Sequence, residues 1–236
     1  MLGPNVSSER QPRRSAASGV LFATFAGGFA IVSISASARQ NRMAPWIVGR
    51  GLGVAAYLAL TAVVLLGTWY SHPWRFRRPV LHPAVQLRAH AVLASATLAL
   101  VAGHVSALIL DRYARVGVGG AFIPGTSGYR PGAVALGTVA LYLGAAAGGT
   151  AALAGRILAG HRWLEVHRFA ALVFVTCWFH GVLAGSDTPA LRPMYIVTGV
   201  AVLVLTVTRH AARSPEFRTG GNDAVRAGAQ ESGIRG

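Results

Sequence analysis

Long apolar stretches alternate along the chain with short polar segments that carry most of the arginines. Most of these stretches reach the roughly 20 residues that an α-helix needs to cross the hydrocarbon core of a bilayer. The pattern predicts an all-α membrane protein, a six-helix transmembrane bundle with no catalytic domain outside the membrane. The predicted spans cover residues 19–38, 47–70, 85–110, 131–153, 163–183 and 193–207.

Both ends of the chain are polar. Residues 1–17 and 209–236 hold arginines and few apolar side chains, which predicts disordered cytoplasmic tails on either side of a membrane domain at 18–208. The first apolar run, 19–38, has two interpretations, because its small-residue end is also typical of a cleaved secretory signal. We favour a retained helix, since the run is long enough to span. The later helices keep their topology in either case.

The composition agrees with a membrane protein. Of 236 residues, 53% are hydrophobic and 12% are charged, whereas about a quarter of a soluble protein is charged. The net charge of +15 would suit a nucleic-acid partner, but the arginines stand at the ends of apolar segments rather than on one basic face, so we exclude that partner. The single cysteine, Cys177, allows no intrachain disulfide and no cysteine-based metal site.

The arginines also predict an orientation. With six spans, 14 arginines lie on the side of the two termini and seven lie on the other side. Cytoplasmic segments carry the excess of basic residues, so both termini are expected in the cytoplasm. The 14 arginines on the side of the termini are Arg10, Arg13, Arg14, Arg75, Arg77, Arg78, Arg88, Arg156, Arg162, Arg209, Arg213, Arg218, Arg226 and Arg235, and the seven on the other side are Arg39, Arg42, Arg50, Arg112, Arg115, Arg130 and Arg192.

All 22 basic residues are arginine, a bias typical of a GC-rich bacterial source.

Two glycine-rich segments imitate nucleotide-binding motifs without the required context. Gly51 and Gly53 follow no strand and belong to no βαβ unit, so we assign them to close helix packing. Residues 116–132 have no lysine and no following P-loop helix, which predicts a flexible extramembrane loop. The small residues expected to form a packing stripe on the fourth span are Gly144, Gly148 and Ala152.

Four histidines interrupt the apolar pattern of the third and fifth spans: His90 and His104, then His167 and His180. An ionisable side chain inside a membrane span is costly enough to indicate a functional site. The two gaps are 14 and 13 residues, which corresponds to roughly 20 Å of helix in each case. Each span therefore places one histidine toward each face of a hydrocarbon core about 30 Å thick.

One predicted helix separates the third and fifth spans, so these two spans run parallel. We expect His90 to pair with His167 at the cytoplasmic end, and His104 to pair with His180 toward the outside. Two imidazoles that face each other at one depth suit the axial positions of haem iron. Because protein ligands then fill both positions, oxygen has no easy place on the iron, and we expect the haems to carry electrons.

The four histidines also allow roles without haem. A lone histidine in an apolar helix usually serves packing or hydrogen bonding. Zinc is a rival metal, but a structural zinc site takes four ligands and each depth offers two. The 13-residue gap is awkward, because 14 positions return close to the same helix face and 13 do not. The fifth span would need tilt, local unwinding or a π-bulge.

The segments Leu87-Arg88-x-His90, Val166-His167-Arg168 and Phe179-His180-Gly181 resemble the ferric reductase-like transmembrane domain over residues 45–210. That superfamily includes ferric reductases, NADPH oxidases and the bacterial MsrQ haem subunit. The resemblance implies a six-helix bundle with two b haems between the third and fifth helices that pass electrons across the membrane. For a bacterial source, we expect this to be the cytoplasmic membrane. The flavin and NADPH domain of the larger members has no counterpart after the sixth span. We therefore expect no flavin or NAD(P) site, and a separate donor that is a flavoprotein or a quinone.

Smaller roles are expected for several further residues. Arg88 and Arg168 adjoin the inner histidines and either pair with haem propionates or anchor the helix ends at the cytoplasmic face. Tyr129 and Arg130 are candidates for contact with the outer haem. Cys177 is expected in the core. The histidines expected in solvent are His72, His82, His161 and His210.

Three functions fit the sequence. The first is a di-haem b-type oxidoreductase component that passes electrons across the membrane to ferric iron or another oxidant at the outer face. The second keeps this fold but supplies a periplasmic methionine sulfoxide reductase, as an MsrQ-like subunit. The third is a haem-free transporter or assembly factor with histidines in polar packing. A reduced-minus-oxidised spectrum separates the first two from the third.

Overall fold

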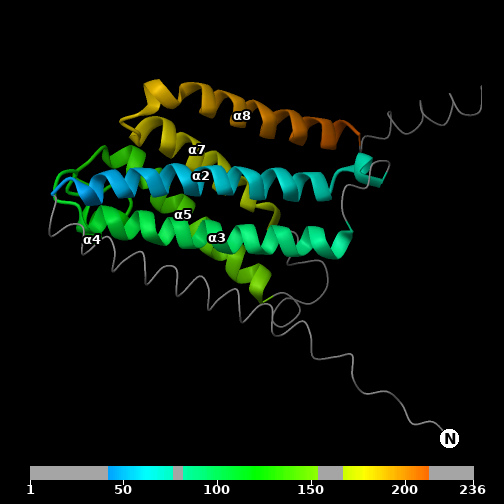
Figure 1. Ribbon diagram of the computed structural model, residues 1–236, viewed down its shortest axis with the longest axis horizontal. Coiled ribbons are helices and arrows are strands. Elements are labelled where there is room, and N and C mark those ends of the chain that lie inside the picture. Colours follow the sequence, from blue (N-terminus) through cyan, green and yellow to red (C-terminus); the bar gives the residue numbers. More distant parts are fainter. Residues whose placement is uncertain (1–41, 77–81, 154–166, 213–236) are drawn as a thin grey trace, which may run out of the picture.

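The computed structural model describes residues 42–76, 82–153 and 167–212, and every regular element in these ranges is helical (Figure 1). The predicted span 19–38, the N-terminal tail and residues 213–236 lie outside the described ranges. The elements are α2 (Ala44–Tyr70), η1 (Pro73–Phe76), α3 (Pro83–Leu110), α4 (Gly117–Phe122), α5 (Pro131–Ala152), α7 (Ala170–Ala184) and α8 (Thr188–Ala211).

Four helices, α2, α3, α5 and α8, are long and apolar enough to cross a bilayer, and α7 is a shorter apolar helix of 15 residues. Large apolar side chains cover their outer faces, for example Val197 and Leu203 of α8, which are 65% and 62% exposed. A continuous apolar surface of this kind is unfavourable in water and suits contact with lipid tails. The chain is therefore a multi-pass membrane protein, as predicted.

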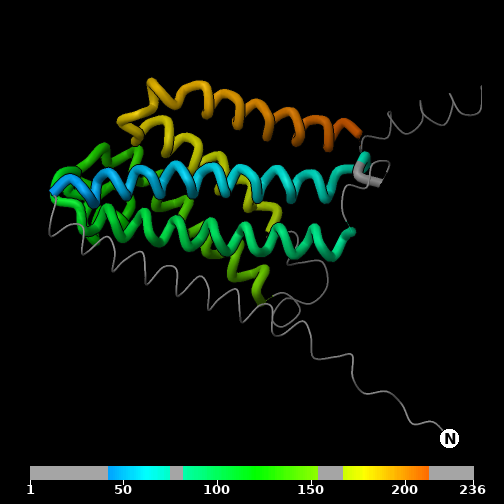
Figure 2. The backbone as a smooth tube through the Cα atoms, viewed as in Figure 1, coloured from blue at the N-terminus to red at the C-terminus, as the bar shows by residue number. Residues whose placement is uncertain are grey.

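Two antiparallel hairpins form the centre of the bundle. α2 packs along α3, and α5 packs along α7; these are the two most extensive helix contacts in the described ranges. α2 also contacts α7, and α3 contacts α5, so the four helices form a ring in which α3 and α7 lie diagonally opposite each other. α8 lies on the outside of this ring, against α2 and α7 (Figure 2).

Small residues let the helices of each hairpin approach closely. Ala107 of α3 is completely buried, and a Cβ added to Gly49 of α2 would lie 3.3 Å from its methyl carbon. Membrane helices associate through such van der Waals contact because lipid tails are as apolar as the side chains. Two of the three residues predicted to form the packing stripe of α5 are in contact, since Gly144 faces α7 and Gly148 faces α3, whereas Ala152 is exposed.

The last helix begins earlier than predicted. The sequence placed its start at Pro193, because proline commonly marks a helix boundary, but α8 begins at Thr188 and encloses Pro193. Proline is tolerated inside membrane helices when neighbouring groups satisfy the backbone carbonyl that it frees. The observed helix has 24 residues, which is long enough to span a bilayer.

The segment 116–132 is packed, so the prediction of a flexible loop was wrong. It contains α4, which begins at Gly117 with a positive φ of 63°. Its Ser127 is buried, and the hydroxyl of Tyr142 in α5 donates to the Phe122 carbonyl at 2.5 Å. Small residues and turns allow this segment to fold against the helix ends rather than extend into solvent.

We predict that Ala107→Leu destabilises the bundle by about 1–3 kcal/mol, because the larger side chain must push α2 and α3 apart. The matched control is Ala102→Leu on the same helix, where the side chain is exposed. Thermal unfolding of both variants in detergent, followed by circular dichroism, measures the difference. Equal midpoints for the two variants would show that the α2–α3 contact is not tight at Ala107.

Candidate functional site

The four intramembrane histidines form two facing pairs between α3 and the α7 segment. The ring centroids of His90 and His167 are 6.1 Å apart, with an interplanar angle of 75°. Those of His104 and His180 are 6.4 Å apart, with an angle of 76°. We call these the inner pair and the outer pair. The structure thus brings together the same histidines that the sequence paired, on two helices that run parallel.

The two pairs lie at different depths of the bundle. His90 and His104 are 14 residues apart on α3, which corresponds to about 21 Å of helix. The shorter gap between His167 and His180 is accommodated by an interruption: residues 167 and 168 are helical, Phe169 is a turn, and α7 begins at Ala170. Local unwinding was one of the three expected solutions, and the break at Phe169 agrees with it.

Backbone carbonyls of the neighbouring helices orient the outer pair. His104 donates from Nδ1 to the Gly49 carbonyl of α2 at 2.7 Å, and His180 donates from Nδ1 to the Ala133 carbonyl of α5 at 2.8 Å. A carbonyl oxygen can only accept, so the proton of each neutral ring is on Nδ1. Nε2 is then the nitrogen that carries the lone pair. Histidines that bind metals are typically oriented in this way.

His90 of the inner pair is surrounded differently from the outer histidines. His90 lies beside the backbone of Val63 in α2, but its Nδ1 makes no hydrogen bond of ordinary geometry with a described residue. The ring of Tyr70 packs edge-on against His90, with centroids 6.2 Å apart. All four histidine side chains are half-buried, so each ring is partly enclosed by the bundle.

The geometry of each pair fits two axial ligands of one metal ion. A bond between a metal and an imidazole nitrogen is about 2 Å long, so two rings on opposite sides of one ion have centroids about 6 Å apart. The observed separations are 6.1 and 6.4 Å. Among the described residues, no three histidine, cysteine or acidic side chains lie close enough together to hold a metal ion. Two nitrogens at each site suit bis-histidine haem and do not make a tetrahedral zinc site.

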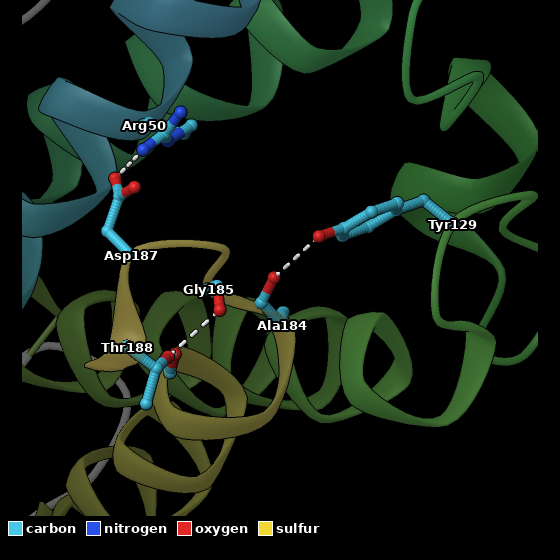
Figure 3. Close-up of polar contacts among 7 residues, drawn as sticks. Arg50, Tyr129, Ala184, Gly185, Asp187 and Thr188 are labelled. Atoms are coloured by element: carbon cyan, nitrogen blue, oxygen red, sulfur yellow. Dashed lines mark hydrogen bonds and ion pairs between the residues drawn. The ribbon is translucent and has the colours of Figure 1, made fainter. Parts of the chain in front are cut away.

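Polar side chains hold the end of α7 next to the outer pair. Tyr129 donates from its hydroxyl to the Ala184 carbonyl at 3.1 Å (Figure 3). Arg130 donates to the Leu183 carbonyl at 2.6 Å, and Thr188 donates to the Gly185 carbonyl at 2.9 Å (Figure 3). These carbonyls have no partner within the helix because they belong to its last turn. Tyr129 and Arg130, expected near the outer haem, thus bind the backbone of α7.

An ion pair reinforces the same end of the bundle. Arg50 of α2 pairs with Asp187, which directly precedes α8 (Figure 3). The guanidinium of Arg50 also lies over the ring of Trp46, 5.6 Å from its centroid. Together these contacts connect the start of α2 to the start of α8. The sequence did not indicate this pairing, because Arg50 and Asp187 are far apart in the chain.

Arg88 and Arg168 adjoin the inner pair and are exposed. His82 and His210 are exposed, as predicted, and His82 accepts from the Ala84 backbone to cap α3. His161 lies outside the described residues.

The expectation for His72 was wrong. His72 is 1% exposed, and it packs between Trp69 and Trp74, with ring centroids 5.9 and 4.9 Å away. Its Nδ1 accepts from the Trp74 backbone at 3.2 Å. The two tryptophans that lie near it in the sequence therefore enclose this histidine. Cys177 packs against the aromatic cluster of α2, α7 and α8, which confirms its place in the core.

Comparison of the chain with protein-family models, with curated proteins and with solved structures found no match.

Proposed function

We propose that this protein is a di-haem b-type electron-transfer protein of the ferric reductase-like kind. The observation that supports it most directly is the pair of facing histidines at each of two depths, with centroids 6.1 and 6.4 Å apart. When bound, each haem would supply one reversible one-electron centre whose potential depends on its ligands and burial. The chain has no Cys-x-x-Cys-His attachment motif, so the haems would be held without covalent bonds.

The residues of the chain have distinct roles in this proposal. His90 and His167 would bind one haem, and His104 and His180 the other. Two histidines would ligate each haem from the protein itself, and that would favour electron transfer over oxygen binding. Arg88 and Arg168, exposed beside the inner pair, are suited to bind haem propionates because guanidinium groups pair bidentately with carboxylates. Positive-inside anchoring is the alternative role for these arginines.

The direction of electron flow follows from the proposed orientation. The inner pair lies at the end of the bundle where α2 ends and α3 begins, and the sequence that joins these two helices contains Arg75, Arg77 and Arg78. If that end faces the bacterial cytoplasm, electrons enter at the inner pair from a flavoprotein or a quinone. They leave at the outer pair for ferric iron or another external oxidant. The protein would thus be the membrane component of an oxidoreductase with a separate donor.

We predict that replacing one outer ligand removes one haem and stops transmembrane transfer. His104→Ala and His180→Ala should each lose the outer haem and keep an inner haem that the donor reduces. His90→Ala and His167→Ala should each lose the inner haem. The measurements are haem content of the purified protein, and reduction of external ferric citrate by vesicles supplied with a membrane-permeant quinol.

The control for this series is His210→Ala, an exposed histidine on α8 that should leave both haems in place. Because an emptied pocket can loosen the bundle, His104→Gly with added imidazole tests whether a free ligand restores the outer haem. If all four alanine variants kept both haems, the ligand assignment would fail. If His104→Ala behaved like His90→Ala, while His180→Ala behaved like His167→Ala, the pairing by depth would fail.

We also predict that a reporter fused to the C-terminus is active only if it functions in the cytoplasm. The arginine asymmetry of 14 to seven is the reason. A pair of fusions, one to a cytoplasmic fluorescent reporter and one to a periplasmic phosphatase, makes the comparison at one site. Phosphatase activity at the C-terminus would reverse the proposed orientation and with it the direction of electron flow.

A further inference from the structure

Three of the four histidine rings lie directly against a glycine of the partner helix in their hairpin. A Cβ added to Gly53 of α2 would lie 2.9 Å from both Cε1 and Nδ1 of His104. A Cβ added to Gly137 of α5 would lie 2.7 Å from the same two atoms of His180. At these distances a methyl group cannot fit unless the ring moves.

The inner pair shows the same arrangement in a weaker form. A Cβ added to Gly67 of α2 would lie 3.1 Å from Cε1 of His90. Gly53 and Gly67 are 14 residues apart, as are His104 and His90. Because α2 and α3 are antiparallel, one register places each histidine of α3 opposite one glycine of α2.

Two of these glycines, Gly53 and Gly137, lie one helical turn after the carbonyl that faces the same histidine. The Gly49 carbonyl, which accepts from His104, precedes Gly53 by four residues, and the Ala133 carbonyl, which accepts from His180, precedes Gly137 by four. Residues four apart share a helix face. A carbonyl oxygen has two lone pairs, so it can accept from the ring as well as from the helix. A side chain at Gly53 or Gly137, four residues further along the helix, would cover the carbonyl that accepts from the ring.

We propose that Gly53, Gly137 and Gly67 are positioning residues that set the orientation of the histidine ligands and, at the outer pair, their Nδ1 hydrogen bonds. This proposal rests on the proposed function. An N–H donated to a carbonyl raises the basicity of the ligand nitrogen, which stabilises the oxidised metal and lowers its reduction potential. The outer pair has two such bonds, at 2.7 and 2.8 Å. Gly53 and Gly137 would also place a Cβ closer to their rings than Gly67 would to His90, so the potential of the outer centre should depend most on the glycines.

Not every glycine of these helices lies against a neighbour, and Gly51, which the sequence assigned to close helix packing, has open space around it. A Cβ added to Gly51 of α2 or to Gly149 of α5 would meet nothing within 4 Å. Alanine at either position should improve helix propensity without touching a ring. Gly51→Ala and Gly149→Ala are therefore matched controls for Gly53→Ala and Gly137→Ala.

The test compares the purified full-length variants by haem content, by redox titration and by EPR of the ferric form. Gly53→Ala and Gly137→Ala should raise the potential of the outer centre or lower its haem occupancy. They should also change its EPR anisotropy, which depends on the angle between the two imidazole planes. Gly67→Ala should affect the inner centre alone and by less. Gly51→Ala and Gly149→Ala should match the wild type.

If Gly53→Ala and Gly137→Ala matched their controls in all three measurements, the positioning role would be overturned while the proposed function stood. If the wild type contained no haem, the proposed function itself would fail first. If an alanine variant does not fold, the hydrogen bonding of the histidine ligands is measured in the wild type instead. The electron spin-echo signal of the imidazole nitrogens that do not bind iron reports it. Strongly hydrogen-bonded Nδ1 atoms at the outer centre support the proposal, and unbonded ones overturn it.

Discussion

An imidazole inside a lipid-embedded bundle has one N–H and one lone pair to satisfy where water is absent. Leaving such a group without a partner costs free energy, on the order of several kcal/mol in an apolar medium. The outer pair meets the first demand with backbone carbonyls, since His104 and His180 donate to Gly49 and Ala133. The second demand falls on Nε2 of two rings that face each other. In the proposed function, a metal ion between them would satisfy both lone pairs at once.

The architecture of the bundle follows from this demand. Two hairpins, α2 with α3 and α5 with α7, give each histidine helix its own partner with accessible carbonyls. The parallel course of α3 and α7 brings their histidines together at two depths. The turn at Phe169 lies between His167 and His180, the two histidines with the shorter gap. α7 carries His180 near its C-terminal end, and Tyr129 and Arg130 bind the carbonyls of its last turn.

Much of this arrangement could be predicted from the sequence, because the apolar runs are long enough to span a bilayer and two of them carry histidines at nearly equal spacing. The runs gave α2, α3 and α5 to within three residues. The fifth predicted span is interrupted at Phe169 before α7 begins, and α8 extends beyond the predicted span at both ends. The parallel course of the third and fifth spans gave the pairing of His90 with His167. The burial of His72 was missed, because a histidine between two tryptophans near a helix end also suits an interfacial position.

The carbonyl acceptors could not be predicted, since every residue has a carbonyl and only the helix register selects Gly49 and Ala133. A sequence signal did exist for the glycines: Gly53 and Gly67 repeat the 14-residue spacing of the histidines on the next helix. It becomes informative only once α2 and α3 are known to be antiparallel partners.

The most direct test of the central claim is the haem content of the purified wild-type chain, measured by the pyridine haemochrome assay together with a redox titration. The expected result is two non-covalent b haems per chain, low-spin in the ferric form, that are reduced in two one-electron steps. A protein without haem, with covalently attached haem, or with a single haem per chain would contradict the di-haem proposal.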